Sequence, residues 1–218
     1  MNKIALCYSG STRTFEYCVK NHAQIFENCD VFVSTWDKPQ RLDHINSPDY
    51  KKINLNVPEK ITEKYIKDLM PDQFNLVDIR VDEYNENLIK KNNATNHDQL
   101  SFQYFKIKDC FDLLKKSGMK YDFVVRIRMD ITIENCFFST DKICVPHIVW
   151  YNYPFGQRQV NEMIWTCNQE LMEKTTLTYD NLEKIRSTHG EAITYESFCM
   201  QNLQEKLQPQ NFNYMVIR

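Results

Sequence analysis

Three charged side chains stand at every second position of one otherwise apolar segment, YDFVVRIRMDITI, at residues 121–133. They are Arg126, Arg128 and Asp130, and because successive side chains of a β-strand point to opposite faces, all three share one face. The other face is wholly apolar, with Phe123, Val125, Ile127, Met129 and Ile131. Two guanidinium groups beside a carboxylate at a strand end could hold an anion together with a divalent metal ion.

The same pattern also fits an ion-pair network that only stabilises a half-exposed strand, because structural Arg–Asp pairs have this spacing too. The charges lie in the C-terminal half of the segment, and open α/β sheets leave a crevice for ligands at the carboxyl ends of their strands. Both interpretations, a ligand site and a structural pair, stay open at this point.

A second polar segment, SGSTRT at residues 9–14, follows the apolar run KIALCY and precedes a stretch with helical spacing. Free backbone N–H groups and the helix dipole suit phosphate oxygens there, and Arg13 can add a bidentate contact. Gly10 permits close approach of the backbone. We therefore expect Ser9, Gly10, Ser11 and Arg13 to bind a nucleotide, although Ser and Thr before a helix also serve as plain N-caps. The loop matches neither GxxxxGKS/T nor GxGxxG.

Strand-like and helix-like segments alternate through most of the chain. The sequence predicts strands over residues 3–8, 30–37, 74–81, 121–133, 142–146, 163–167 and 212–217, and helices over residues 15–29, 58–70, 98–117, from 168, and over 190–206. Gly118 stands where a helix cap is expected, and residues 38–58, 85–98 and 150–159 are expected to be loops. This order predicts an α/β fold with a mainly parallel or mixed central sheet flanked by helices.

The composition limits the classes of function. The 218 residues, 42% hydrophobic and 26% charged, fit one domain over residues 1–218. A net charge of -2 argues against a general nucleic-acid binder. We expect no signal peptide and no membrane-spanning segment, and hence a cytoplasmic protein. The eight cysteines lack CxxC spacing and are expected to be reduced, buried thiols rather than a zinc site.

Five segments in this order resemble a family of GT-A-fold glycosyltransferases found in large algal DNA viruses and in polysaccharide gene clusters: ALCYSGSTRTFEYC, DVFVSTW, YDFVVRIRMD, VNEMIWTCNQELM and HGEAI. The resemblance spans nearly the whole chain. It implies one Rossmann-like GT-A domain, with a nucleotide-binding part over about residues 1–133 and an acceptor-binding part over about residues 134–218. The chain is also compatible with being the N-terminal domain of a longer protein, in the host cytoplasm if viral.

The resemblance also implies a metal site. GT-A enzymes end the central strand in a DxD motif that holds Mn²⁺ or Mg²⁺, and the corresponding place here reads Arg128-Met129-Asp130. Asp130 is then the metal ligand, Arg126 and Arg128 contact the donor, and His189 adds a metal or diphosphate contact. The missing first aspartate puts strict metal dependence in question, and His189 also fits a surface histidine near a helix start.

An inverting transferase needs a carboxylate that takes the proton of the acceptor hydroxyl, whereas a retaining one does not. Glu162 is the first candidate and Glu191 the second, because the resemblance places Asn161-Glu162 near the sugar and the acceptor. Each glutamate also fits a capping carboxylate at a helix start.

Aromatic side chains of the segment WYNYPFGQRQ offer flat faces of the kind that stack on sugar rings, although they also fit a plug at the edge of the core. We expect Trp150, Tyr151 and Tyr153, together with Asn161, to line the acceptor site. At the ends of the first two strands, Tyr8 and Asp37 are candidate contacts to the base and the ribose.

The preferred prediction is a metal-dependent hexosyl- or deoxyhexosyltransferase that moves a sugar from a nucleotide-diphosphate sugar, such as a UDP-sugar, to a glycan acceptor. One alternative is a sugar nucleotidyltransferase, but the segment SGSTRT holds one glycine and no lysine, unlike the Gly-rich loops of those enzymes. The other is a non-catalytic nucleotide- or carbohydrate-binding module in which Asp130 and the arginines pair only with each other.

Overall fold

A seven-stranded sheet forms the centre of the computed structural model, which describes residues 2–39, 50–51, 57–84, 98–151, 157–182, 184 and 193–217, with the backbone alone at 50–51, 98–101, 149–151, 157–159 and 193–194. The strand order is β11 (Leu207–Pro209), β7 (Ile143–Val145), β10 (Ile164–Cys167), β5 (Phe123–Arg128), β1 (Ile4–Gly10), β2 (Asp30–Trp36) and β4 (Asn75–Asp82). The strands β5, β1, β2 and β4 run parallel, and β10 runs antiparallel to both of its neighbours.

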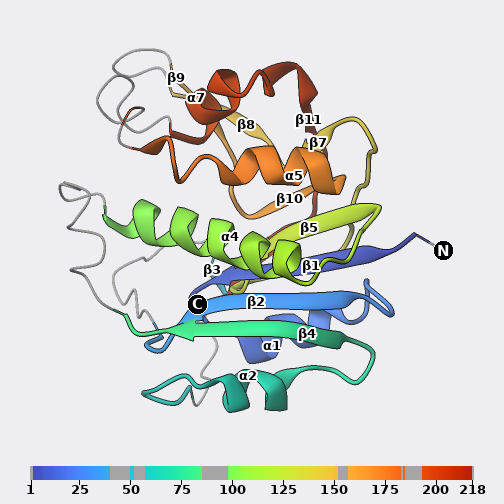
Figure 1. Cartoon of the computed structure of the whole chain (residues 1–218), viewed down its shortest axis with the longest axis vertical. Helices are drawn as coiled ribbons and strands as arrows, with labels where there is room; N and C mark the ends of the chain where they lie inside the picture. The colour runs from blue at the N-terminus through green and yellow to red at the C-terminus, as the bar shows by residue number, and fades with distance from the viewer. Residues whose placement is uncertain are drawn as a thin grey trace.

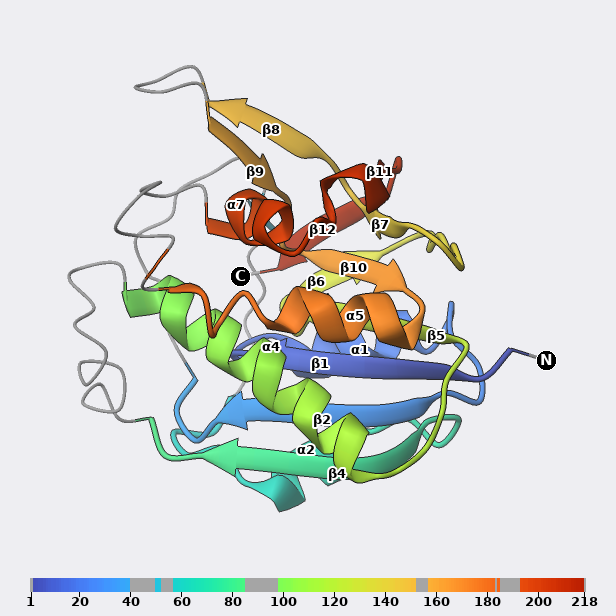
Figure 2. The same cartoon turned by 45° about the horizontal axis from the view of Figure 1, so that its top comes forward.

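Helices cover both faces of this sheet (Figure 1, Figure 2). On one face lie α4 (Asp98–Lys116) and α5 (Gln169–Thr176), and on the other lie α1 (Phe15–His22) and α2 (Glu63–Leu69). Strand β1 shows the alternation that this requires, because Ala5 and Cys7 belong to the core under α4, whereas Leu6 and Tyr8 belong to the core under α1. The amino end of α4 lies at the edge toward which the arrowheads of β2 and β4 point in Figure 2.

Two smaller sheets complete the fold: β3 (Tyr50–Lys51), β12 (Tyr214–Ile217) and β6 (Ile131–Ile133) form one, and β8 (Ile148–Tyr151) and β9 (Gln157–Val160) form the other. The prediction of one strand over residues 121–133 is therefore wrong. The chain turns at Met129 and Asp130, and the next three residues pair with β12 instead of continuing the large sheet. The predicted apolar face is nevertheless confirmed for Val125, Ile127, Met129 and Ile131, which share one buried cluster.

Other predicted boundaries also shift, each for a local reason. Helix α1 ends at His22 rather than near residue 29. Helix α2 begins after Thr62, whose side chain accepts a hydrogen bond from the backbone N–H of Tyr65 at 3.1 Å, and not at Pro58. The predicted helix over residues 190–206 is described as α7 (Ile193–Met200) and a 3₁₀ turn, η1 (Gln204–Lys206), with Asn202 at φ 55° between them. The predicted loop over residues 150–159 is wrong at both ends, because residues 150–151 belong to β8 and residues 157–159 to β9, and the two strands pair with each other.

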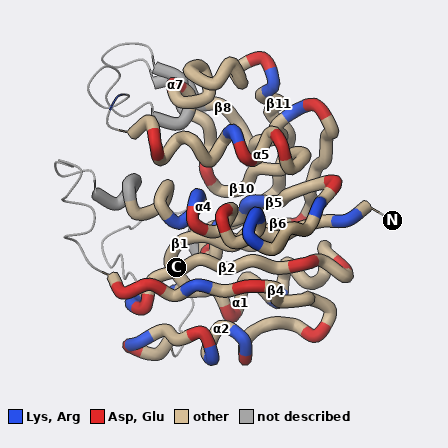
Figure 3. Tube along the Cα trace, in the orientation of Figure 1, with Lys and Arg blue, Asp and Glu red and all other residues tan. Residues whose placement is uncertain are grey.

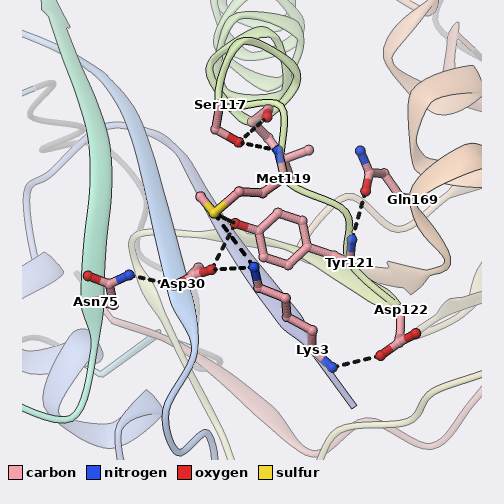
Figure 4. A network of polar contacts seen from close by, with 9 residues as sticks. Lys3, Asp30, Asn75, Ser117, Met119, Tyr121, Asp122 and Gln169 are labelled. Atoms are coloured by element: carbon pink, nitrogen blue, oxygen red, sulfur yellow. Dashed lines mark hydrogen bonds and ion pairs between the residues drawn. The ribbon is translucent and has the colours of Figure 1, made fainter.

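Polar side chains tie the amino edge of the large sheet together (Figure 4). The carboxylate of Asp30 accepts hydrogen bonds from Asn75 at 2.6 Å and from the hydroxyl of Tyr121 at 2.9 Å, and Lys3 lies 3.5 Å away. The backbone N–H of Tyr121 in turn donates to Gln169 at 2.9 Å, which links β5 to the start of α5. The polar groups at this edge therefore have structural partners.

All eight cysteines are free thiols, and six are buried, as predicted. Gly118 has φ +69° just past α4, which confirms the helix cap. Acidic and basic positions are interspersed along the described trace (Figure 3). Within the described part of the chain, every helix is too short or too polar to cross a bilayer. The predicted division near residue 133 stays a prediction.

Candidate functional site

The loop after β1 meets the carboxyl end of β5. Nη2 of Arg13 lies 3.7 Å from Oδ2 of Asp130, and in the parallel pairing of the two strands Ser9 stands beside Arg128. Strand β12 fixes both pieces, because the backbone N–H of Ile217 donates to the carbonyl of Asp130 at 2.8 Å, and the hydroxyl of Thr14 donates to the carbonyl of Ile217 at 3.0 Å. The two segments that the sequence singles out therefore form one site.

Asp130 is held by arginine on both sides. Its Oδ1 accepts a hydrogen bond from Nε of Arg128 at 2.8 Å and its Oδ2 accepts one from Nη2 of Arg128 at 2.7 Å, which makes a bidentate pair. Arg13 approaches Oδ2 from the loop after β1. The side chain of Asp130 is only 3% exposed. The ion pair considered as an alternative in the sequence is thus present, and it lies inside the candidate site.

The expected metal does not fit this arrangement. A divalent cation takes carboxylate lone pairs and several further oxygen ligands, but both oxygens of Asp130 are engaged by guanidinium groups, which would repel a cation. Among the described residues, no group of three or more His, Cys, Asp or Glu side chains is placed to hold a metal ion. His189, the second predicted ligand, lies outside the described residues.

Arg126 is a buried cation that forms no hydrogen bond with the described residues. It is 1% exposed, and none of its three guanidinium nitrogens has a hydrogen-bonding partner in the described part of the chain. Its guanidinium carbon lies 5.0 Å from the centre of the Trp165 ring. Burial lowers the pKa of Arg126 to about 10, and the charge of Glu162 opposes this decrease. An unpaired buried charge is costly, so such a group usually marks either a missing partner or a functional role.

Glu162 lies at the start of β10, beside the end of β5. The backbone N–H of Arg128 donates to the carbonyl of Met163 at 3.0 Å, which holds the two strand ends together. The carboxylate of Glu162 accepts hydrogen bonds from the hydroxyl of Tyr104 and, at 2.6 Å, from the amide of Gln103. Glu162 is half-buried and therefore reaches the site from the side of α4.

The contribution of α4 is the part of the site that the sequence analysis missed. In the sequence, Tyr104 fits the regular spacing of apolar residues on one face of a helix. Nothing in the sequence links it to Glu162, which lies 58 residues later. The neighbouring polar residue Gln103 is the one local signal, because it stands next to the buried face of the helix.

The loop of residues 9–14 has the space and the polar groups that were expected. Gly10 has φ +117°, and a Cβ placed there would meet nothing within 4 Å, so a ligand can approach its backbone closely. The hydroxyls of Ser9 and Thr12 are buried and form no hydrogen bond within the described residues. Ser11 and Arg13 are half-buried. Thr14 precedes α1 but does not cap it with its side chain.

Three other predicted site residues make contacts within the fold. Tyr8 is 0% exposed, and its hydroxyl lies 3.0 Å from Nδ1 of the buried His22. Its contact with a base stays a prediction. Asp37 accepts a hydrogen bond from the backbone N–H of Tyr84 at 2.8 Å. Asn161 donates to the hydroxyl of Tyr214 at 2.9 Å and accepts from the backbone N–H of Met163, which shapes the turn before β10.

The remaining predicted residues receive no test. The structure describes the backbone of Trp150 and Tyr151 but not their side chains, and Tyr153 and Glu191 lie outside the described residues. The predicted acceptor wall and the second candidate base therefore stay predictions.

Comparison with known proteins supports the fold. No family model and no curated protein sequence matches this chain. Among solved structures, the fold is similar to that of the glycosyltransferase GlyE of Streptococcus pneumoniae TIGR4, with a TM-score of 0.50 and 11% sequence identity over 96% of this chain and 46% of that one. The chain thus spans about half the length of GlyE. The predicted fold class, an α/β domain with a mixed sheet between helices, is confirmed, and it is a fold that a glycosyltransferase uses.

Proposed function

We propose that this chain is a glycosyltransferase that moves a sugar from a nucleotide-diphosphate sugar to a hydroxyl group of a glycan. The observation that carries the proposal is the meeting of the loop after β1 with the end of β5, where Arg13 and Arg128 contact Asp130. Arg126, two residues earlier on β5, lies within the electrostatic influence of Glu162. Among the described residues, three guanidinium groups and two carboxylates meet here, and this excess of positive charge suits a diphosphate. The similarity of the fold to GlyE adds support.

In the proposed reaction the acceptor oxygen forms a bond to the anomeric carbon of the sugar. The bond between that carbon and the phosphate oxygen breaks, and its electron pair stays on the phosphate oxygen. Glu162 takes the proton of the acceptor hydroxyl. Tyr104 and Gln103 orient the carboxylate of Glu162 by donating to its two oxygens, and the arginines favour the charge that develops on the diphosphate. Mn²⁺ or Mg²⁺, expected from the resemblance, would supply the same stabilisation, but Asp130 does not fit as its ligand.

The test is release of nucleoside diphosphate from nucleotide sugars, with UDP-hexoses and UDP-deoxyhexoses measured first, in the presence and absence of glycan acceptors. Turnover with one donor is expected, and Glu162→Gln should abolish most of it. Glu134→Gln is a matched control, because Glu134 is exposed and follows the end of β6 rather than the site. Equal turnover in the Glu162→Gln variant would remove Glu162 from the proposed role and favour a retaining reaction or another base.

One observation favours a second candidate, a non-catalytic nucleotide- or carbohydrate-binding module. The bidentate pair of Arg128 and Asp130 is complete without a ligand. Binding of nucleotides without hydrolysis or transfer of any nucleotide sugar would support this module.

A further inference from the structure

The charges around Asp130 deepen the proposed function, on which this inference rests. In a metal-dependent site the carboxylate at the strand end must present free lone pairs to a cation. Here both oxygens of Asp130 accept hydrogen bonds from Arg128, at 2.8 and 2.7 Å, and Arg13 lies 3.7 Å away. The geometry gives Asp130 a different task, which is to hold two guanidinium groups from two different segments next to each other.

Arg126 supplies the second, independent observation. It lies two residues before Arg128 on the same strand, and therefore on the same face of the sheet. Its three nitrogens are buried and have no hydrogen bond among the described residues. Burial has removed water from this guanidinium group, and no described residue replaces it with a hydrogen bond. An anionic ligand that reaches the group therefore gains hydrogen bonds at little further cost of desolvation.

We propose that arginines take the place of the divalent cation in this protein, so that Arg13, Arg126 and Arg128 bind the diphosphate of the donor and neutralise the charge of the leaving nucleotide. Guanidinium groups bind phosphate oxygens in a bidentate manner, and they carry their charge at neutral pH, Arg126 with its pKa of about 10 included. Asp130 is a positioning residue that fixes Arg13 and Arg128, and it is not a metal ligand. The hydroxyls of Ser9, at the end of β1, and Thr12, on the loop that carries Arg13, have no hydrogen bond among the described residues and can donate to the same phosphates.

The first experiment measures the affinity of the full chain for UDP by calorimetry, once after treatment with EDTA and once with Mn²⁺ added. The dissociation constants should agree within about threefold, and release of UDP from the donor sugar should continue in EDTA. Binding or turnover that appears only with Mn²⁺ would overturn the inference while leaving the proposed function intact. Absence of both binding and turnover in either condition would overturn the inference and the proposed function together.

The second experiment identifies the groups that bind. Arg126→Met should weaken UDP binding by about 10- to 100-fold, because a hydrogen bond to a charged group contributes about 1.5–3 kcal/mol. Arg126→Lys keeps the positive charge but lacks the planar set of N–H donors of a guanidinium group. It should therefore bind UDP more tightly than Arg126→Met but less tightly than the original protein. Arg80→Gln is the matched control, since Arg80 pairs with Asp109 away from the site and should leave the affinity unchanged. UDP affinity that is the same in all three variants would remove Arg126 from the site and refute its part in the inference.

Discussion

Replacing Arg126 by methionine should make the free protein more stable. The guanidinium group is 1% exposed and forms no hydrogen bond within the described residues, so the folded state carries a desolvated charge that the unfolded chain does not. Methionine has a similar length, fills the same space beside Trp165 and carries no charge. Replacement of a buried charge by an apolar side chain of similar volume is often neutral or stabilising.

The size of the effect follows from the pKa of Arg126. Burial lowers it from 12.5 to about 10, and each unit is worth about 1.4 kcal/mol, so the charged form costs the folded state about 3 kcal/mol at neutral pH. The sign is that of a base with a lowered pKa, because the unfolded chain holds the proton more tightly. The contact with the ring of Trp165, at 5.0 Å, offsets about 1 kcal/mol. The variant should therefore gain about 2 kcal/mol and its Tm should rise by about 4–8 °C.

Thermal and urea unfolding of the two proteins measure this difference, and Lys106→Met provides a contrast. Lys106 is also 0% exposed, but its ammonium group pairs with Asp82 and lies 4.2 Å from the centre of the Trp36 ring. Its removal leaves a carboxylate without its partner and should lower the stability by about 1–3 kcal/mol. The two buried cations should thus respond with opposite signs. An Arg126→Met variant that is less stable than the original protein by more than about 1 kcal/mol would show that Arg126 stabilises the fold, and the reasoning would fail.

Three further outcomes follow from the contacts described. Glu162→Gln should lower the turnover by about 10²–10⁴-fold while UDP affinity, measured by calorimetry, changes little; a parallel loss of affinity would argue for a structural role. Tyr104→Phe removes one of the two side chains that orient Glu162, so kcat should fall by about tenfold, which corresponds to one hydrogen bond, with KM for the donor unchanged. Lowering the pH from 7 to 4.5 should reduce the free energy of unfolding by about 3 kcal/mol. Burial holds the pKa of His22 at about 3, so only the unfolded chain takes up the proton between these pH values. The same pH dependence in the His22→Asn variant would contradict this assignment.

The sequence predicts the faces of the strands better than their ends. Alternation along residues 121–133 correctly assigns Val125, Ile127 and Met129 to one core. It cannot show that the strand stops at Arg128, because β6 owes its position to pairing with β12, more than 80 residues later in the chain. Pairing between distant segments is not encoded in local periodicity. The same limitation explains why the bidentate pair of Arg128 and Asp130, formed across the turn, could only be left as an alternative.

The position of a residue at a strand end is an equally incomplete guide to its role. Ser9 and Tyr8 are neighbours at the end of β1, and both were candidates for nucleotide contacts. The pleat directs Ser9 toward the site and Tyr8 into the core under α1, where the hydroxyl of Tyr8 meets His22. Side chains at alternate positions of β1 lie on opposite faces of the sheet. The face that carries the charged residues of β5 therefore distinguishes Ser9 from Tyr8.

Arg126 connects the stability of the free protein to its affinity for the donor. If the cost of about 3 kcal/mol in the folded protein arises from a missing anion, a phosphate that reaches Arg126 returns that free energy on binding. The rise in Tm produced by saturating UDP should then be larger in the original protein than in Arg126→Met. The variant has no buried guanidinium group, so UDP binding cannot relieve the destabilisation that this group causes in the original protein. The two proteins should differ most when free and least when saturated with UDP. A constant difference in Tm at all UDP concentrations would mean that the burial of Arg126 has no connection with ligand binding.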